Sequence, residues 1–137
     1  FVASEPARKR LLQLGESAQA VFNIGSPDID VMLSGNLPTL AEAKTRYQIN
    51  YDDFAIAMLH PVTTELASQA KNANCFVDAL IASGDNFIVV YPNNDSGSEH
   101  IFAALERLKN VPQCRIFPSL RFEHFLTLLK HLPTPVF

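Results

Sequence analysis

Short continuous runs of apolar residues alternate along this chain with longer stretches in which apolar residues recur every three or four positions. The runs at residues 54–59 and 87–91 predict buried strands, and residues 115–117 predict a third. Each run is followed by a helical stretch, which predicts an α/β fold built on a parallel sheet. The apolar positions expected on these three helices are Leu66, Ala70, Ala73, Val77, Leu80 and Ile81, then Ile101, Phe102, Leu105 and Leu108, then Phe122, Phe125, Leu126, Leu129 and Leu132.

The part of the chain before the first apolar run carries signals of shorter elements. Residues 1–15 predict a helix, residues 20–24 predict a short strand, and a helical turn is expected after Pro27. Thr39 and Glu42 have the spacing of a capping box, in which each side chain accepts a hydrogen bond from the other residue's backbone. This pair predicts the start of another helix.

The loop after the second strand, residues 92–99 (PNNDSGSE), opens directly into a helix. Ser96 and Glu99 have capping-box spacing and predict where that helix begins. In a parallel sheet such a loop lies at the carboxyl edge of the strands, where the N–H groups of Gly97, Ser98 and Glu99 would point at an anion. Replacing Gly97 by valine is expected to block the anion and leave the fold intact. The pattern also fits an ordinary strand-to-helix turn.

A polar residue follows each of the three strands closely: His60, Asn93 and Ser119. Because right-handed crossovers bring the ends of parallel strands to one edge, these residues are expected to gather along one rim of the sheet. An imidazole at such a rim can bind an anion or protonate a leaving group, although many histidines have only a structural role. His60 is therefore the candidate catalytic residue.

The composition is that of an ordinary globular domain: 137 residues, 47% hydrophobic and 18% charged, with a net charge of −3. The lack of a basic stretch argues against nucleic acid as the main partner. No run is long enough to span a membrane, no secretory signal is visible, and Cys75 and Cys114 lack metal-ligand spacing. We therefore expect a cytoplasmic protein with reduced thiols, no metal, no cofactor and no membrane partner.

Four segments in this order resemble the hydrolysing UDP-N-acetylglucosamine 2-epimerases, in particular the branch that feeds the synthesis of sialic acid, polysialic acid and related nonulosonic acids. They are residues 25–30 (GSPDID), 60–65 (HPVTTE), 91–99 (YPNNDSGSE) and 119–126 (SLRFEHFL). The resemblance extends over essentially the whole chain.

The resemblance implies a two-domain protein of the glycosyltransferase-B type, in which a UDP-sugar lies between two Rossmann-like halves. Such enzymes eliminate UDP from UDP-N-acetylglucosamine and add water, which yields N-acetylmannosamine without metal or nicotinamide. On this basis residues 1–18 are an interdomain helix or linker. Residues 19–137 are a nucleotide-binding domain with helices on both faces of its sheet, incomplete at its carboxyl-terminal end. The apolar residues at both ends of the chain also suggest a piece of a longer protein, whose missing amino-terminal domain would carry the catalytic carboxylates. A homo-oligomer is expected for the intact protein.

The resemblance also assigns roles to individual residues on the rim. His60 would be catalytic and would contact the diphosphate, while Asp95 would cap the helix or hold its loop, because a carboxylate would repel a phosphate. The residues expected to bind UDP are His60, Asn93, Gly97, Ser98, Ser119 and Leu120.

Two other classes of protein share parts of this pattern. A receiver domain would use Asp95 as its phosphoacceptor, but it needs acidic residues after its first strand, and Asp52 and Asp53 precede Phe54 instead. The donor-binding half of a glycosyltransferase-B enzyme would have the same fold. Product analysis separates the two enzymes, because one releases free N-acetylmannosamine and the other transfers a sugar.

Overall fold

The computed structural model describes residues 1–132 of the chain; the apolar end at residues 133–137 lies outside them. The chain forms two compact units, Phe1–Leu37 and Pro38–Phe137. Each unit is described by itself below. The boundary between these compact units falls at residues 37 and 38, and the division at residues 18 and 19 expected from the sequence stays a prediction.

The second unit is built on a three-stranded parallel sheet in the order β1 (Ala55–Met58), β2 (Phe87–Val90) and β3 (Cys114–Phe117). All three strands lie where the apolar runs predict them, and their carboxyl ends share one edge of the sheet. The register pairs Ala55 with Phe87 and Phe87 with Cys114 at one end, and Met58 with Val90 and Val90 with Phe117 at the other.

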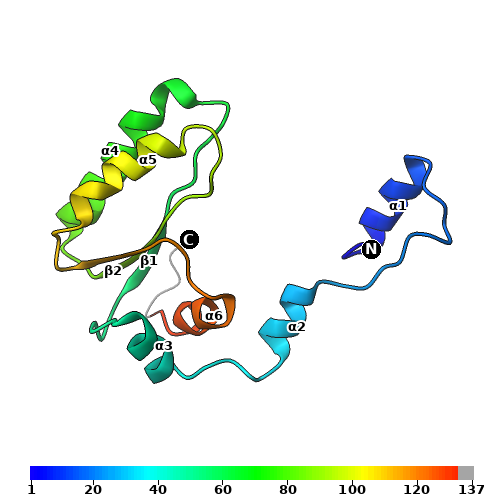
Figure 1. Ribbon diagram of the computed structural model, residues 1–137, viewed down its shortest axis with the longest axis horizontal. Helices are drawn as coiled ribbons and strands as arrows, with labels where there is room; N and C mark the ends of the chain where they lie inside the picture. Colours follow the sequence, from blue (N-terminus) through cyan, green and yellow to red (C-terminus); the bar gives the residue numbers. More distant parts are fainter. Residues whose placement is uncertain (133–137) are drawn as a thin grey trace. The chain divides into compact units, whose positions relative to one another are not determined.

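Helices cover both faces of this sheet, as the α/β pattern predicts (Figure 1). The long helix α4 (Leu66–Ser83) packs beside α5 (Ser98–Leu105), which continues into a short 3₁₀ helix, η1 (Glu106–Leu108). Helix α3 (Leu40–Tyr47) packs against α6 (Phe122–Lys130) on the opposite face.

Two neighbouring residues of β2 show how the sheet divides the hydrophobic core. Val89 packs with Val77 of α4 and Ile101 of α5, whereas Ile88 packs with Ala43 of α3 and Leu128 of α6. Successive side chains of a strand point to opposite faces, so each face receives its own apolar cluster. Both β2 residues are almost completely buried, as expected for a central strand covered on both sides.

The local signals that begin the helices are only partly correct. At α3 both hydrogen bonds of the Thr39–Glu42 capping box form, as predicted. At α5 the predicted Ser96 cap is wrong: Gly97 precedes the first helical residue with φ +95°, and Glu99 Oε2 accepts the Gly97 N–H at 3.1 Å. At α6 Arg121 takes the capping position without a side-chain hydrogen bond.

The buried face of α6 also differs from the predicted stripe. Leu126, Thr127 and Leu128 are buried, whereas Leu129 is 46% exposed. Thr127 can occupy a buried position because its hydroxyl donates to the carbonyl of Pro38, just ahead of α3, at 2.7 Å. Contact with α3 therefore decides which side of α6 turns inward.

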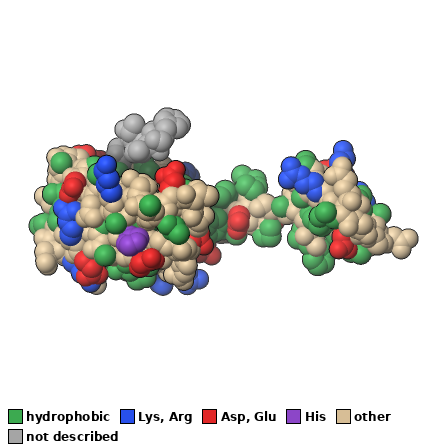
Figure 2. All heavy atoms as spheres, turned by 90° about the horizontal axis from the view of Figure 1, so that it is seen from above, with side chains coloured by type: hydrophobic (Ala, Val, Ile, Leu, Met, Phe, Trp, Pro, Cys, Tyr) green, Lys and Arg blue, Asp and Glu red, His purple; other side chains and the backbone are tan. Residues whose placement is uncertain are grey.

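The first unit contains α1 (Glu5–Gln13) and α2 (Pro27–Leu33), close to where the sequence predicts helices. The predicted strand at residues 20–24 is wrong, because only an isolated parallel bridge forms between Val2 and Asn23. Val21 is the single buried residue of Phe1–Leu37, and Figure 2 shows hydrophobic side chains on the surface of this unit. An extended segment without neighbouring strands cannot build a sheet.

Candidate functional site at the carboxyl edge of the sheet

Two loops meet at the carboxyl edge of β1 and β2. The His60 loop comprises residues 60–65 and the Asn93 loop comprises residues 92–97. The Asn93 N–H donates to Nδ1 of His60 at 3.1 Å, so the structure brings together two residues that are 33 positions apart. Both are exposed, as a ligand site at this edge requires. The gathering of His60 and Asn93 at one rim follows from the parallel register of their strands.

This hydrogen bond determines the tautomer of the neutral His60 ring. A backbone N–H can only donate, so Nδ1 of His60 must be the acceptor and carries no proton. The proton of the neutral ring therefore lies on Nε2, to which no other residue of the described chain is hydrogen-bonded. His60 can thus offer one N–H to a ligand oxygen at the rim.

The side chain of Asn93 is held by its own loop. Its Nδ2 group donates to Oδ2 of Asp95 at 2.7 Å, which agrees with the loop-holding role expected for Asp95. This contact orients the amide of Asn93 and leaves its Oδ1 atom as an acceptor. A ligand group that donates a hydrogen bond, such as a hydroxyl or a ring N–H, suits that oxygen.

The backbone N–H groups at the start of α5 already donate hydrogen bonds within the protein, which the sequence does not reveal. The Gly97 N–H donates to Glu99 Oε2 at 3.1 Å, and the Ser98 N–H donates to the Asp95 carbonyl at 3.1 Å. A carboxylate oxygen at the Gly97 N–H occupies the kind of position that a phosphate oxygen would take. A phosphate that binds there must displace the Glu99 side chain.

Gly97 also has a packing role that the sequence does not reveal. A Cβ atom at this position would lie 2.9 Å from Leu66 Cδ2 and 3.4 Å from Gln69 Cγ, both in α4. With φ at +95°, any side chain would also strain the backbone. Gly97→Val should therefore also destabilise the fold, which the sequence alone does not predict.

The third segment of the predicted site, Ser119 and Leu120, follows β3. Ser119 is exposed, and Leu120 packs on the cluster formed by Ile88 and Leu128. Tyr47 of α3 anchors this segment, because its hydroxyl accepts the Arg121 N–H at 2.9 Å. The Tyr47 ring also packs edge-on against Phe117, with ring centroids 5.3 Å apart.

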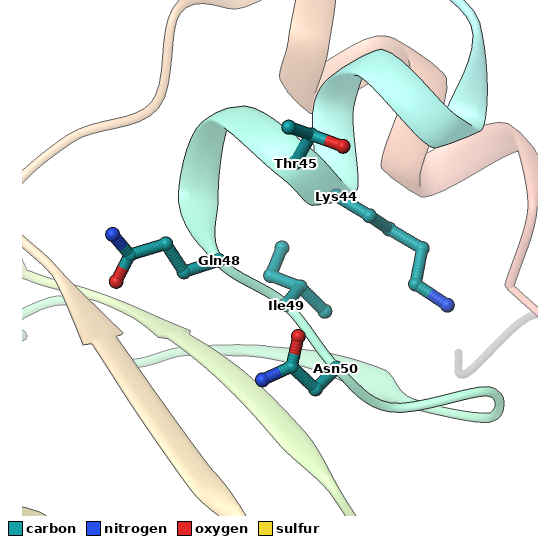
Figure 3. Close-up of a pocket in the computed structure, with 5 residues that line it drawn as sticks. All are labelled: Lys44, Thr45, Gln48, Ile49 and Asn50. Carbon is teal, nitrogen blue, oxygen red and sulfur yellow. The ribbon is translucent and has the colours of Figure 1, made fainter.

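Two open pockets near α3 lie apart from these residues. One is lined by Lys44, Thr45, Gln48, Ile49 and Asn50 at the end of the helix (Figure 3). The other is lined by Ala41, Glu42, Thr45, Arg46 and His124. Neither contains a residue that the sequence assigns to the site.

Three further features of residues 1–132 concern metal ligands, helix hydrophobicity and cysteines. Residues 1–132 contain no group of three or more His, Cys, Asp or Glu side chains that could hold a metal ion. Within the same residues, every helix is too short or too polar to cross a membrane. Cys75 and Cys114 are both free, and burial raises the pKa of the Cys114 thiol. A buried thiol with a raised pKa is a poor nucleophile.

The match to known proteins agrees with the resemblance of the four segments. A family model described as UDP-N-acetylglucosamine 2-epimerase matches residues 1–133. The chain belongs to this epimerase family. A UDP-N-acetylglucosamine 2-epimerase of Neisseria meningitidis serogroup B is 47% identical over 131 residues, which is 96% of this chain and 34% of that protein.

Less similar relatives of this chain carry related names. The polysialic acid biosynthesis protein P7 of Escherichia coli is 30% identical over 96% of this chain and 34% of its own length. A hydrolysing UDP-N,N'-diacetylbacillosamine 2-epimerase of Legionella pneumophila is 27% identical over 94% of this chain and 34% of its own length. The chain thus spans about a third of the length of these curated relatives.

Proposed function

We propose that the intact protein is a hydrolysing UDP-N-acetylglucosamine 2-epimerase that converts UDP-N-acetylglucosamine to N-acetylmannosamine and UDP for sialic acid, polysialic acid or related nonulosonic acid synthesis. The structural observation that carries the proposal is the contact between His60 and Asn93 at the carboxyl edge of the sheet. Family membership and the 47% identity to the Neisseria protein support the choice of reaction.

In this reaction His60 acts on the departing diphosphate. Loss of the C2 proton and cleavage of the bond between C1 and the phosphate oxygen produce UDP and an unsaturated acetamido sugar, and water then adds across the double bond. As the C1–O bond breaks, negative charge develops on the phosphate oxygen, to which the Nε2–H of His60 donates. Stabilisation of charge that appears only in the transition state raises kcat. The group that removes the C2 proton belongs to the part of the protein outside this chain.

The remaining predicted residues bind the nucleotide. Oδ1 of Asn93 accepts a hydrogen bond from the uridine portion, and the backbone of Ser119 and Leu120 meets the uracil ring. The Gly97 and Ser98 amides receive the diphosphate once Glu99 moves away from the Gly97 N–H. These assignments require neither a metal nor a nicotinamide cofactor.

Product analysis of the intact protein tests the reaction. Incubation with UDP-N-acetylglucosamine should release UDP and free N-acetylmannosamine, which NMR spectroscopy distinguishes from a transferred sugar. UDP-N,N'-diacetylbacillosamine is the second candidate substrate, because the Legionella and Campylobacter jejuni relatives are named for it. Preferred turnover of that sugar would correct the substrate and keep the reaction, whereas sugar transfer would refute the reaction itself.

A pair of His60 variants tests the role of the imidazole. His60→Gln places an amide N–H near the Nε2 position and should retain part of the activity, whereas His60→Ala removes the donor. We expect His60→Ala to lower kcat by roughly 10²-fold or more, with a smaller loss of UDP affinity. If UDP affinity collapses while kcat is unchanged, His60 only binds the nucleotide.

The proposal extends to the context of the chain. We infer a cytoplasmic protein that forms a homo-oligomer and consists of two Rossmann-like halves. This chain supplies the UDP-binding half, and the remaining polypeptide supplies the catalytic carboxylates. The relatives, which are about three times as long as the matched region, support the existence of that remaining part. Size-exclusion chromatography with light scattering tests the oligomeric state.

A further inference from the structure

Gln69 is a polar side chain buried in the early part of α4, with only 2% of its surface exposed. Its Oε1 atom accepts the N–H of Val62 at 3.1 Å. Val62 lies in the His60 loop, two residues after His60. A buried amide that bonds to the backbone of a loop restricts the positions that the loop can take.

The same side chain also supports the Asn93 loop. Its Cγ atom would lie 3.4 Å from a Cβ at position 97, which places it directly beneath Gly97. Pro61, the residue after His60, would lie 3.6 Å from the same Cβ. Gln69 therefore occupies the space beside Gly97 of one loop with its methylene groups and accepts a hydrogen bond from Val62 of the other with its amide oxygen.

These contacts bear on the hydrogen bond that defines His60. The distance of 3.1 Å between the Asn93 nitrogen and Nδ1 of His60 depends on how closely the two loops approach. We propose that Gln69 is a positioning residue, which holds the His60 loop against the Asn93 loop so that His60 keeps its proton on Nε2. The inference rests on the proposed function, because Nε2 is the atom that would face the phosphate.

The first experiment detects the tautomer without substrate. In the intact protein, ¹⁵N NMR spectroscopy of the His60 ring should show an unprotonated Nδ1 and a protonated Nε2. Gln69→Met keeps the length of the side chain but removes the oxygen, so it should produce a mixture of tautomers. Asn72→Met also replaces an amide by a thioether, but on the exposed side of α4, and should match the wild type. An unchanged His60 spectrum in folded Gln69→Met overturns the inference, whether or not the protein acts on UDP-N-acetylglucosamine.

Gln69→Glu covers the case in which Gln69→Met does not fold. The glutamate retains an oxygen at the position of Oε1 and should preserve the wild-type tautomer. Loss of that tautomer in folded Gln69→Glu overturns the inference, because the oxygen that bonds to Val62 is still present.

The second experiment measures whether Gln69 acts through His60. Gln69→Met should lower kcat/KM for UDP release about fivefold, the size of effect expected from one lost hydrogen bond. In the His60→Ala background the same substitution should lower kcat/KM less than about twofold, because the residue that it positions is absent. If Gln69→Met lowers kcat/KM by the same factor in the wild type and in His60→Ala, Gln69 has a general structural role and the inference is overturned. Absence of UDP release from the wild type would instead refute the proposed function, and the NMR comparison would still decide the role of Gln69.

Discussion

The two units of this chain bury their apolar residues to very different extents. In Pro38–Phe137, Ile88, Leu108 and Leu128 are completely buried, and the sheet has an apolar cluster on each face. In Phe1–Leu37 only Val21 is buried, and the large apolar side chains that stay exposed are Phe1, Leu14, Phe22, Ile24, Ile29, Met32 and Leu33.

This difference shows which part of the chain buries enough apolar surface to form a stable domain. A short segment cannot bury enough apolar surface to offset the entropy lost on folding, whereas a sheet with helices on both faces can. Exposed apolar side chains gathered on one segment mark a surface that another part of a protein covers. We therefore expect another part of the intact protein to cover the apolar side chains of Phe1–Leu37.

The largest expected effect concerns catalysis by the chain alone. Residues 1–137 should release UDP from UDP-N-acetylglucosamine at least about 10²-fold more slowly than the intact protein, because general acid–base groups contribute that much or more. An assay of UDP release at equal molar concentrations checks this. Turnover near that of the intact protein would mean that this chain contains the whole active site, and it would refute the proposal that the remaining polypeptide supplies the catalytic carboxylates.

Two leucine substitutions compare how much one apolar side chain of each unit contributes to stability. Leu128→Ala removes a completely buried side chain and should lower the free energy of unfolding by about 2–5 kcal/mol. Leu33, which is 79% exposed, should tolerate alanine in the isolated chain to within about 0.5 kcal/mol. Urea denaturation followed by circular dichroism measures both.

The same substitutions in the intact protein sharpen the test. Leu33→Ala should now cost about 1–3 kcal/mol if the remaining polypeptide covers this side chain. Leu128→Ala should cost the same as in the isolated chain. An intact protein that is indifferent to Leu33→Ala would leave that surface uncovered and refute our expectation.

A matched pair of glycines measures the close contact beneath the candidate site. Gly84 and Gly97 both have positive φ, but a Cβ at position 84 would have nothing within 4 Å. Gly84→Ala should cost about 1–2 kcal/mol from backbone strain alone. Gly97→Ala should cost about 1–2 kcal/mol more, because its Cβ would lie 2.9 Å from Leu66. Equal losses in thermal denaturation would show that Leu66 moves aside freely.

The smallest expected effect concerns the capping box of α3. Hydrogen bonds from the backbone and side chain of Thr39 lower the pKa of Glu42 below its ordinary value of 4.5. A lowered pKa in the folded state adds stability that is complete above the ordinary value and is lost as the pH falls through the lowered value. Glu42→Gln should therefore flatten the pH dependence of the melting temperature below about pH 4.5. An unchanged profile would mean that this exposed carboxylate adds nothing to the fold.

Local patterns predicted much of the second unit. The three strands follow from their apolar runs, and the Thr39–Glu42 box forms because its partners are three residues apart. The meeting of His60 and Asn93 was also predictable, because each closely follows a strand of the same parallel sheet. The four segments that resemble the epimerase family were sufficient to identify it before any fold was known.

Contacts between distant parts of the chain decided the rest. Gly97 rather than Ser96 precedes α5, in a position that packs on Leu66 and Gln69. Leu128 rather than Leu129 is buried because α3 covers that side of α6. Residues 20–24 form no strand because the bridge between Val2 and Asn23 is their only strand-like pairing in the described part of the chain. Gln69 and Tyr47 contact the candidate site from helices, so no motif within the loops of the site predicts their contribution. Hydrogen bonds between residues a few positions apart and the periodicity of apolar residues can be predicted from the sequence itself. Which of several apolar or polar side chains becomes buried depends on the neighbour that the fold brings against it.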